Sequence, residues 1–162
     1  MISVITVMGV SGCGKTTIGS ALAHRLGWKF IESDEYHSEA DIQKMSQGVP
    51  LTDEDRWPWL ERLNKLLHEE IQDGQRIVLA CSALKQSYRE ILYTGIHDGI
   101  YIYLKGSYGL IRKRMQQRKH FMKANMLQSQ FDALEEPRNA LIFDIRLAED
   151  EIIDQIMRKL ML

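Results

Sequence analysis

Cysteine is scarce in this sequence, and no disulfide is expected. The chain has two cysteines in 162 residues, Cys13 inside a glycine-rich loop and Cys81 at the end of a predicted buried strand. Disulfide scaffolds are shorter and richer in cysteine, whereas isolated thiols are typical of reducing compartments. A chain of this length can bury a sufficient core without disulfides or metals. We therefore predict one domain over residues 1–162, with both thiols free.

Long apolar runs and an excess of one charge are also missing. No stretch approaches the ~20 apolar residues of a membrane-spanning helix, and no basic segment precedes the short N-terminal apolar run. The 21 basic residues nearly balance the 22 acidic residues, which argues against a general binder of nucleic acid or membrane surfaces. No repeat or low-complexity segment occurs. These absences favour a cytoplasmic protein without nucleic-acid or membrane partners, whose ligand-binding cations are local.

The most informative segment is a complete phosphate-binding loop, Gly9-Val10-Ser11-Gly12-Cys13-Gly14-Lys15-Thr16. It lies between an apolar run and a helical pattern, the context in which this motif binds a nucleoside triphosphate. The glycines let backbone N–H groups surround the phosphates, Lys15 reaches the β- and γ-oxygens, and the Thr16 hydroxyl ligates Mg²⁺. The helix that follows, with Thr17 in its first turn, adds the positive end of its dipole. A simple glycine-rich turn would not need the Lys-Thr pair.

Short apolar runs bounded by turn residues recur along the chain, at 2–8, 28–31, 76–80, 100–104 and 140–143. Their nearly continuous hydrophobicity is typical of strands covered on both faces. Between them, apolar residues recur at helical spacing, for example Ile18, Leu22 and Leu26. This alternation predicts an α/β protein with three layers, in which a parallel five-stranded sheet with right-handed crossovers lies between helices.

Polar residues follow three of the predicted strands, at 32–37, 81–85 and 105–107. Ligands of parallel sheets bind at the carboxyl ends of the strands, so these segments are predicted to face the phosphate loop. Two irregular stretches interrupt the alternation. Residues 38–56 contain a short helical segment and a Gly-Val-Pro break, and we interpret them as a substrate-binding flap. The basic stretch 112–126 is interpreted as a lid over the triphosphate.

Asp34 is the best candidate to meet an acceptor hydroxyl. Phosphoryl transfer needs the acceptor in line with the γ-phosphate and a group that accepts or orients its proton. A carboxylate one turn beyond a strand end can fill this role, or it can hold a water on Mg²⁺. The alternative is that Asp34 caps the next helix, because Asp is common at that position. Its neighbours Glu32 and Glu35 are expected to be solvated.

Two pairs of cations are spaced four residues apart. Arg114 and Arg118 are expected on one helical face, where guanidinium groups suit phosphate oxygens and can stabilise charge during transfer. Lys85 and Arg89 follow the third strand and suggest a site for an anionic acceptor. For both pairs the alternative is a solvated basic helix face.

Three further side chains are candidates for binding the acceptor. Arg56 lies in the acidic start of a predicted helix, where its charge is unfavourable unless it binds an anion. His37 and His120 can donate hydrogen bonds, although a lone histidine usually serves local structure. Trp57 and Trp59 are expected to pack rather than to form a ligand platform.

Beyond the phosphate loop, several short motifs follow one another over nearly the whole chain. They are Asp34 with His37, Lys44-Met45 with Gly48, Pro50-Leu51, Asp53 with Asp55-Arg56, Pro58-Trp59-Leu60, Cys81-Ser82-Ala83-Leu84-Lys85 with Tyr88-Arg89, Tyr103-Leu104-Lys105-Gly106, His120-Phe121-Met122 and Ser129-Gln130-Phe131 with Leu134-Glu135 and Pro137. In this combination the chain resembles the gluconokinases. These are small P-loop carbohydrate kinases related in fold to shikimate and nucleoside monophosphate kinases.

The resemblance implies transfer of the γ-phosphoryl group of ATP, with Mg²⁺, to the 6-hydroxyl of D-gluconate. The product, 6-phosphogluconate, would enter the pentose phosphate or Entner–Doudoroff routes, and the protein would be a homodimer. By this analogy Asp34 would meet the acceptor hydroxyl. From the residue reasoning above, we expect Lys15 and Arg118 to act with Asp34 in catalysis and Arg114 to bind nucleotide with the phosphate loop. By the same analogy the sugar-acid site would be lined by His37, Lys44, Arg56, Lys85 and Arg89, and His120 is a further candidate to bind the acceptor.

Two other functions stay open at this point. One is a P-loop kinase for another small acid such as shikimate, or for a nucleoside monophosphate, because the fold permits each and the flap decides between them. The other is a regulator that binds ATP without phosphorylating a metabolite. Asp34 and the two groups of cations argue against the regulator.

Overall fold

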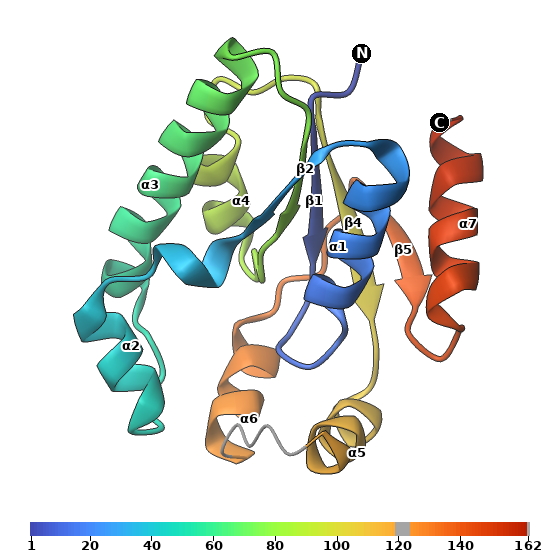
Figure 1. The fold of residues 1–162 in the computed structure, drawn as a ribbon. Coiled ribbons are helices and arrows are strands. Elements are labelled where there is room, and N and C mark those ends of the chain that lie inside the picture. Colours follow the sequence, from blue (N-terminus) through green and yellow to red (C-terminus); the bar gives the residue numbers. More distant parts are fainter. Residues whose placement is uncertain (119–123, 162) are drawn as a thin grey trace.

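The computed structural model describes residues 1–118 and 124–161, and its centre is a parallel sheet of five strands (Figure 1). The strand order is β2-β3-β1-β4-β5, which places the N-terminal strand in the middle. The strands are β1 (Val4–Met8), β2 (Lys29–Glu32), β3 (Ile77–Ala80), β4 (Gly99–Lys105) and β5 (Ala140–Asp144). The predicted α/β fold is therefore confirmed, and every predicted strand is present with ends shifted by one or two residues.

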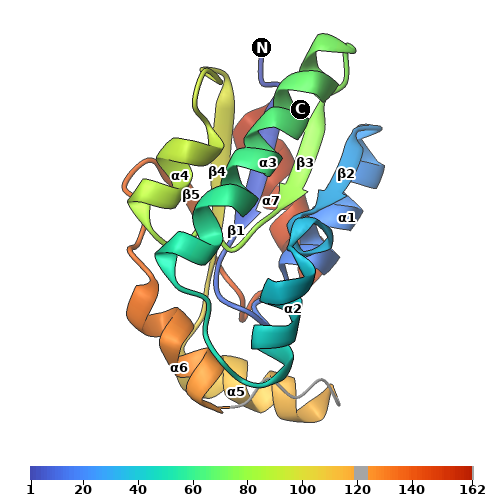
Figure 2. The same ribbon diagram turned by 90° about the vertical axis from the view of Figure 1, so that its left-hand side faces the viewer.

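Helices cover both faces of the sheet. α1 (Lys15–Leu26) and α7 (Glu149–Leu160) lie together on one face, and α3 (Asp53–Gln72) and α4 (Gln86–Leu92) lie on the other, which is turned toward the viewer in Figure 2. The remaining helices gather beyond the carboxyl ends of the strands. They are the 3-10 turn η1 (Ser33–Tyr36), α2 (Glu39–Ser46), α5 (Tyr108–Gln117) and α6 (Ala124–Ala133).

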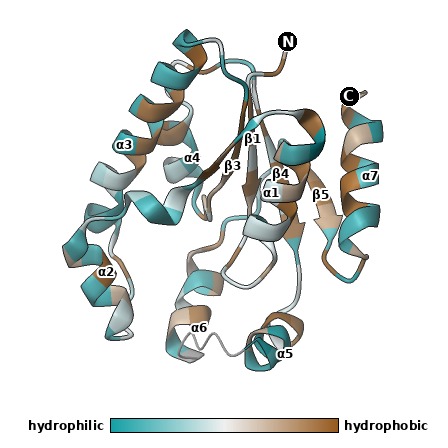
Figure 3. Ribbon diagram, in the orientation of Figure 1, coloured by the Kyte–Doolittle hydropathy of each residue, from teal (hydrophilic) through white to brown (hydrophobic). Residues whose placement is uncertain are grey.

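The core lies between the sheet and these two helical layers. All residues of β1 and β3 are buried, as expected for central strands of a parallel sheet. On α3 the stripe Leu60, Leu63 and Leu67 is fully buried, and α1 contributes Ile18 and Leu22. In Figure 3 the central strands are hydrophobic, whereas the outward sides of α3 and α7 are hydrophilic. This packing holds the strand ends in fixed positions.

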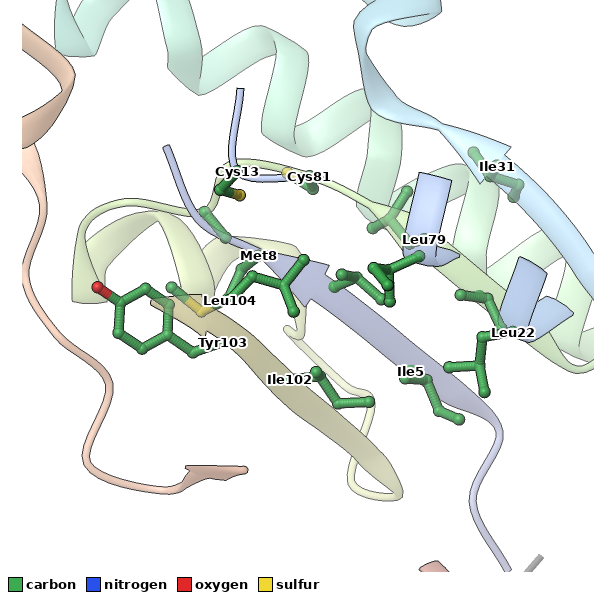
Figure 4. Packing of buried hydrophobic residues seen from close by; sticks show 14 of the residues in the cluster. Ile5, Met8, Cys13, Leu22, Ile31, Leu79, Cys81, Ile102, Tyr103 and Leu104 are labelled. Atoms are coloured by element: carbon green, nitrogen blue, oxygen red, sulfur yellow. The ribbon is translucent and has the colours of Figure 1, made fainter. Parts of the chain in front are cut away.

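The two cysteines belong to the core cluster, part of which is drawn in Figure 4. Both are buried and free, in agreement with the expectation from the sequence. Burial raises the pKa of the Cys13 thiol, and it raises the pKa of Cys81 to about 12. Across the described ranges, no helix has the length and apolar character that a membrane crossing requires.

Candidate active site

The phosphate loop connects β1 to α1 and leaves the start of α1 open. The helix begins at Lys15, and its N-cap residue Gly14 adopts a left-handed conformation with φ 103°, which favours glycine. No side chain caps this end, and the first turn contains no acidic residue. The first N–H groups of α1 therefore have no intrahelical partner and point toward the loop, which is the arrangement that binds phosphate.

The other end of the loop is tightly packed. A Cβ atom on Gly9 would lie 2.7 Å from the Cys13 sulfur and 2.9 Å from the Leu104 carbonyl oxygen. Such contacts are too short for any side chain, so only glycine fits there. The buried Cys13 side chain thus holds the loop close to the end of β4. This close approach explains why the sequence needs its first loop glycine.

The two polar side chains that follow the loop make specific contacts. Lys15 Nζ donates a hydrogen bond to the Val10 carbonyl oxygen at 3.0 Å, so the ammonium group lies over its own loop. The Thr16 hydroxyl donates to Glu32 Oε2 at 2.5 Å. Glu32 ends β2 and is partly buried, and this burial raises the pKa of its carboxyl group. The expectation that Glu32 is a solvated neighbour is wrong, because it contacts the predicted metal ligand.

A cavity of about 290 Å³ lies beside the loop, between the flap, α3 and α6. It collects residues from segments far apart in the sequence, at the edge of the sheet where ligands were predicted. Its lining contains Ser11, Lys15, Asp34, His37 and Arg56 from the predicted set. The other lining residues are Ile42, Met45, Pro50, Leu51, Trp59, Ser82, Met126, Ser129 and Gln130.

Asp34 lies in η1 and presents its carboxylate to the cavity. Its side chain is 80% exposed, and Oδ1 lies 3.8 Å from His37 Nε2. The helix that follows does not use this carboxylate as a cap, since the Ser38 hydroxyl accepts the hydrogen bond from the Asp41 N–H at 3.1 Å. The capping alternative for Asp34 is therefore wrong, and the carboxylate is placed toward the candidate site.

His37 is held rigidly against the buried side of the cavity. Its ring stacks on Trp59 with centroids 4.3 Å apart, and Trp59 Nε1 in turn donates to the Ser33 carbonyl oxygen at 2.9 Å. The side chain is only 5% exposed, and burial lowers its pKa below the usual value. In the part of the chain that the structure describes, His37 Nδ1 is buried without a hydrogen-bond partner. The site thus contains a buried imidazole near Asp34 whose protonated form is disfavoured by burial.

Arg56 enters the cavity from the first turns of α3. One guanidinium nitrogen donates to the Leu51 carbonyl oxygen at 2.6 Å and to the Tyr88 hydroxyl at 3.2 Å. The guanidinium carbon also lies 5.4 Å from the centroid of the Tyr88 ring. These contacts hold the guanidinium group between the residue that precedes the N-cap of α3 and the Tyr88 side chain of α4. Arg56 is a cation of the cavity lining that comes from the start of α3.

Lys44 and Lys85 were predicted to bind the acceptor, but neither lines this cavity. Lys44 pairs with Asp55 at 2.6 Å, and Lys85 pairs with Asp53 at 3.0 Å. The Lys44 ammonium lowers the pKa of Asp55 to about 2. Asp55 also completes a capping box with Thr52. The two lysines therefore attach the flap and α4 to the start of α3.

Arg89 does not line the cavity, contrary to the prediction that it lies in the acceptor site. It is buried, and its guanidinium donates to the carbonyl oxygens of Ala83, Leu84 and Glu135 at 2.7, 3.1 and 2.9 Å. Gln86 Oε1 accepts from the remaining N–H groups at 3.2 and 3.3 Å. Its hydrogen-bonding capacity is thus used inside the protein.

The lid arginines lie apart from the cavity lining. Arg114 donates to the Ile145 carbonyl oxygen at 2.7 Å, which ties α5 to the turn after β5. Arg118 is exposed and forms the C-cap of α5, so the helix ends before it reaches this residue. The two arginines are four residues apart at the end of α5, and their placement on one helical face stays a prediction. His120, the third predicted residue of the lid, lies outside the described residues.

Sequence reasoning missed the contribution of α6. Met126, Ser129 and Gln130 line the cavity from this helix. Gln130 Oε1 accepts a hydrogen bond from the Ser11 backbone N–H at 2.6 Å, and Gln130 Nε2 donates to the Ser11 hydroxyl at 2.8 Å. The residues are separated by 119 positions, and no local pattern indicates their pairing.

The site offers few groups for a metal ion. Among the residues with a described placement, no cluster of three or more His, Cys, Asp or Glu side chains could hold one. Thr16 and Glu32 are adjacent oxygen donors at the phosphate loop. Mg²⁺ suits such a place, since it is usually held by one or two protein oxygens together with substrate phosphates and water. The donor set fits a metal that arrives with a nucleotide.

The chain has the fold of a P-loop small-molecule kinase, because its parallel sheet has this strand order, a phosphate loop follows the central strand and a cavity lies beside that loop. The family model described as shikimate kinase matches residues 11–161. A shikimate kinase from Acinetobacter baumannii has a TM-score of 0.59 at 18% identity, covering 99% of this chain and 94% of that one. At this identity the likeness shows the shared fold.

Closer similarity is to gluconokinases. The probable gluconokinase of Mus musculus is 44% identical, over 98% of this chain and 95% of the mouse protein. The crystal structure of a gluconokinase from Sinorhizobium meliloti 1021 has a TM-score of 0.88 at 39% identity, covering 96% of this chain and 90% of that one. The chain belongs to the gluconokinase family.

Proposed function

We propose that the protein transfers the γ-phosphoryl group of Mg²⁺-bound ATP to the 6-hydroxyl of D-gluconate, which yields 6-phospho-D-gluconate. The observation that carries the proposal is the shared cavity, in which the phosphate loop, Asp34 and Arg56 meet. Relatives named gluconokinases match over most of their length and support this acceptor.

The phosphate loop is the proposed nucleotide site. The uncapped start of α1 and residues Gly9 to Thr17 would surround the phosphates, and Lys15 would leave the Val10 carbonyl to contact them. Thr16 would ligate Mg²⁺, with the Glu32 carboxylate beside it. The ion supplies neutralisation of charge on the transferred group. Arg114 and Arg118 are proposed to act on the nucleotide from the lid.

The acceptor is proposed to lie across the cavity. Arg56 would bind the carboxylate of the sugar acid, because a guanidinium fork matches two carboxylate oxygens. Asp34 would orient the reacting hydroxyl and take its proton. The uncharged His37 would hydrogen-bond a hydroxyl of the acceptor. Lys44, Lys85 and His120 are proposed to complete the site when the flap and the lid close.

Shikimate is the second candidate acceptor, since the matching family model is that of shikimate kinase. The solved shikimate kinase is far less similar than the gluconokinase, 18% against 39% identical. A regulator that binds ATP without turnover is supported by no comparison. A panel of acceptors therefore separates the candidates in one experiment.

The decisive experiment measures ADP production from Mg²⁺ and ATP with D-gluconate, shikimate, AMP or no acceptor. We expect saturable turnover with gluconate and its loss in Lys15→Ala. Asp34→Asn should lower kcat by about 10²–10⁴, the range expected for a lost proton acceptor. The matched control is Glu35→Gln, because it neutralises an exposed carboxylate one residue away. Turnover with shikimate alone, or no turnover with tight ATP binding, would refute the gluconate assignment.

The protein is further proposed to be a cytoplasmic homodimer that works in the pentose phosphate or Entner–Doudoroff routes. The acceptor and product assigned above support the metabolic context. Sedimentation of the purified protein and the location of a tagged chain test the other two statements.

A further inference from the structure

A side-chain amide is bound to the phosphate loop itself. Gln130 of α6 accepts from the Ser11 N–H at 2.6 Å and donates to the Ser11 hydroxyl at 2.8 Å. A backbone N–H can only donate, so the amide oxygen must face it, and the amide nitrogen is then directed at the hydroxyl. The donor and the acceptor of both hydrogen bonds are thus determined by the Ser11 N–H group. These bonds fix one residue of the loop from outside the loop.

The same helix also contacts the flap. Asn125 Nδ2 donates to the Gly48 carbonyl oxygen at 3.0 Å, at the turn that follows α2. Asn125 and Gln130 are five residues apart, which corresponds to about 7.5 Å along a helix. α6 therefore bridges the flap and the phosphate loop. Ser11 and Gln130 both line the cavity with Asp34 and Arg56, so this bridge passes beside the reacting groups.

We propose that Gln130 is a positioning residue for phosphoryl transfer, which fixes the Ser11 part of the phosphate loop between nucleotide and acceptor. The inference rests on the proposed kinase function and assigns a role within the same site. Ser11 lies before the loop residues that lead into α1, and it faces the acceptor cavity. Loss of the Gln130 contacts should therefore disturb the alignment of the transferred group with the acceptor. It should affect the binding of the α- and β-phosphates less.

The test compares Gln130→Leu with Gln128→Leu. Leucine keeps a similar volume and removes both bonds to Ser11. Gln128 is a matched control, because it lies on the same helix, is exposed and bonds only to Asp132 among its described partners. We expect Gln130→Leu to lower kcat with gluconate at least tenfold, about 1.4 kcal/mol in the barrier. The Kd of Mg²⁺-ADP should stay within twofold of wild type, while that of a non-hydrolysable ATP analogue rises severalfold.

Two outcomes would overturn the proposal. One is equal kcat in the two leucine variants. The other is an equal loss of affinity for ADP and for the ATP analogue, which would mean that Gln130 only keeps the loop folded. Should Gln130→Leu not fold, Gln130→Glu retains an acceptor for the Ser11 N–H and adds a negative charge. It should keep ADP binding and the melting temperature and still lose kcat.

The two affinities also separate this proposal from the assignment of the acceptor. They are measured without gluconate, so a wild-type protein inactive on gluconate would refute the proposed function and leave the comparison of the two nucleotides intact. Asn125→Ala tests the other end of the bridge. It should raise the KM for gluconate while leaving the Kd of ADP within twofold. An unchanged KM would mean that Asn125 does not help to place the acceptor and that Gln130 alone has the positioning role.

Discussion

At the scale of single residues, two arginines that resemble each other in their sequence context differ in role, since one lines the cavity and the other is structural. Arg56 and Arg89 both follow segments that reach the carboxyl edge of the sheet. Arg56 lines the cavity, whereas Arg89 is buried and bonded to three backbone carbonyl oxygens. One of these belongs to Ala83, whose φ of 44° is left-handed and is rare for a residue other than glycine. Arg89 therefore holds a strained loop whose neighbour Ser82 lines the cavity.

Replacing Arg89 should chiefly reduce stability. In Arg89→Met the three carbonyl oxygens lose a charged donor, and each unsatisfied buried group costs about 1–3 kcal/mol. We expect the free energy of unfolding in urea to fall by at least about 2 kcal/mol. Arg112→Met, an exposed position on α5, is the control and should have little effect. Unchanged stability together with a raised KM for gluconate would instead restore Arg89 as an acceptor-binding residue.

Residue types at the strand ends predicted part of the site. Lys15, Asp34, His37 and Arg56 meet at one cavity because their segments end at the same edge of a parallel sheet. Charge alone does not show whether a cation is already neutralised by a neighbour. Pairing is decided by contacts between distant segments, such as Lys85 with Asp53. For this reason the sequence could not separate binding cations from structural ones.

At the scale of elements, the start of α3 organises the acceptor side. Its capping box is local and was predictable, since Thr52 precedes an acidic first turn. Its external contacts were not. Asp53 accepts hydrogen bonds from Lys85 and from the Tyr88 hydroxyl, and the same hydroxyl accepts from Arg56. The pKa of Asp53 is lowered, chiefly by the bond from Tyr88. α4 thereby holds the cavity arginine in place.

Tyr88→Phe should loosen Arg56 while leaving the ring beneath its guanidinium. The lost hydrogen bond has a net value of about 1 kcal/mol, so we expect the KM for gluconate to rise about fivefold with little change in the KM for ATP. Tyr103→Phe is the matched control, because its hydroxyl contacts Glu136, which does not line the cavity. Equal effects on both substrates would show that the Tyr88 hydroxyl does not act through Arg56.

At the scale of the whole molecule, alternating strand and helix patterns predicted the sheet and the edge that carries the site. Periodicity is local, so it identified β1, β3 and α1 well. The return of α6 to the phosphate loop was not predictable. That contact joins residues 119 positions apart, and the motif Ser129-Gln130-Phe131 does not indicate that Gln130 pairs with Ser11. Contacts of this kind depend on the assembled fold.

The stability of the molecule should depend on pH through His37. Burial keeps the pKa of His37 in the folded protein below the ordinary value near 6.5. The imidazole therefore binds a proton more weakly in the folded protein than in the unfolded chain. The neighbouring charges are mixed, with Asp34 and Asp41 favouring the proton and Arg56 and Arg62 opposing it. Below about pH 6.5 the unfolded state therefore holds more protons, and the free energy of unfolding falls as the pH falls.

His37→Gln should flatten that pH dependence. Urea unfolding between about pH 7.5 and 5 should show the wild type losing stability faster than the variant below pH 6.5. The exposed His24 of α1 gives a control, His24→Gln, for the loss of an imidazole elsewhere. Parallel curves for wild type and His37→Gln would mean that the imidazole takes up its proton as easily in the fold as in the unfolded chain. Its stacking on Trp59 would then not keep it neutral, and the uncharged donor proposed for the acceptor would be lost.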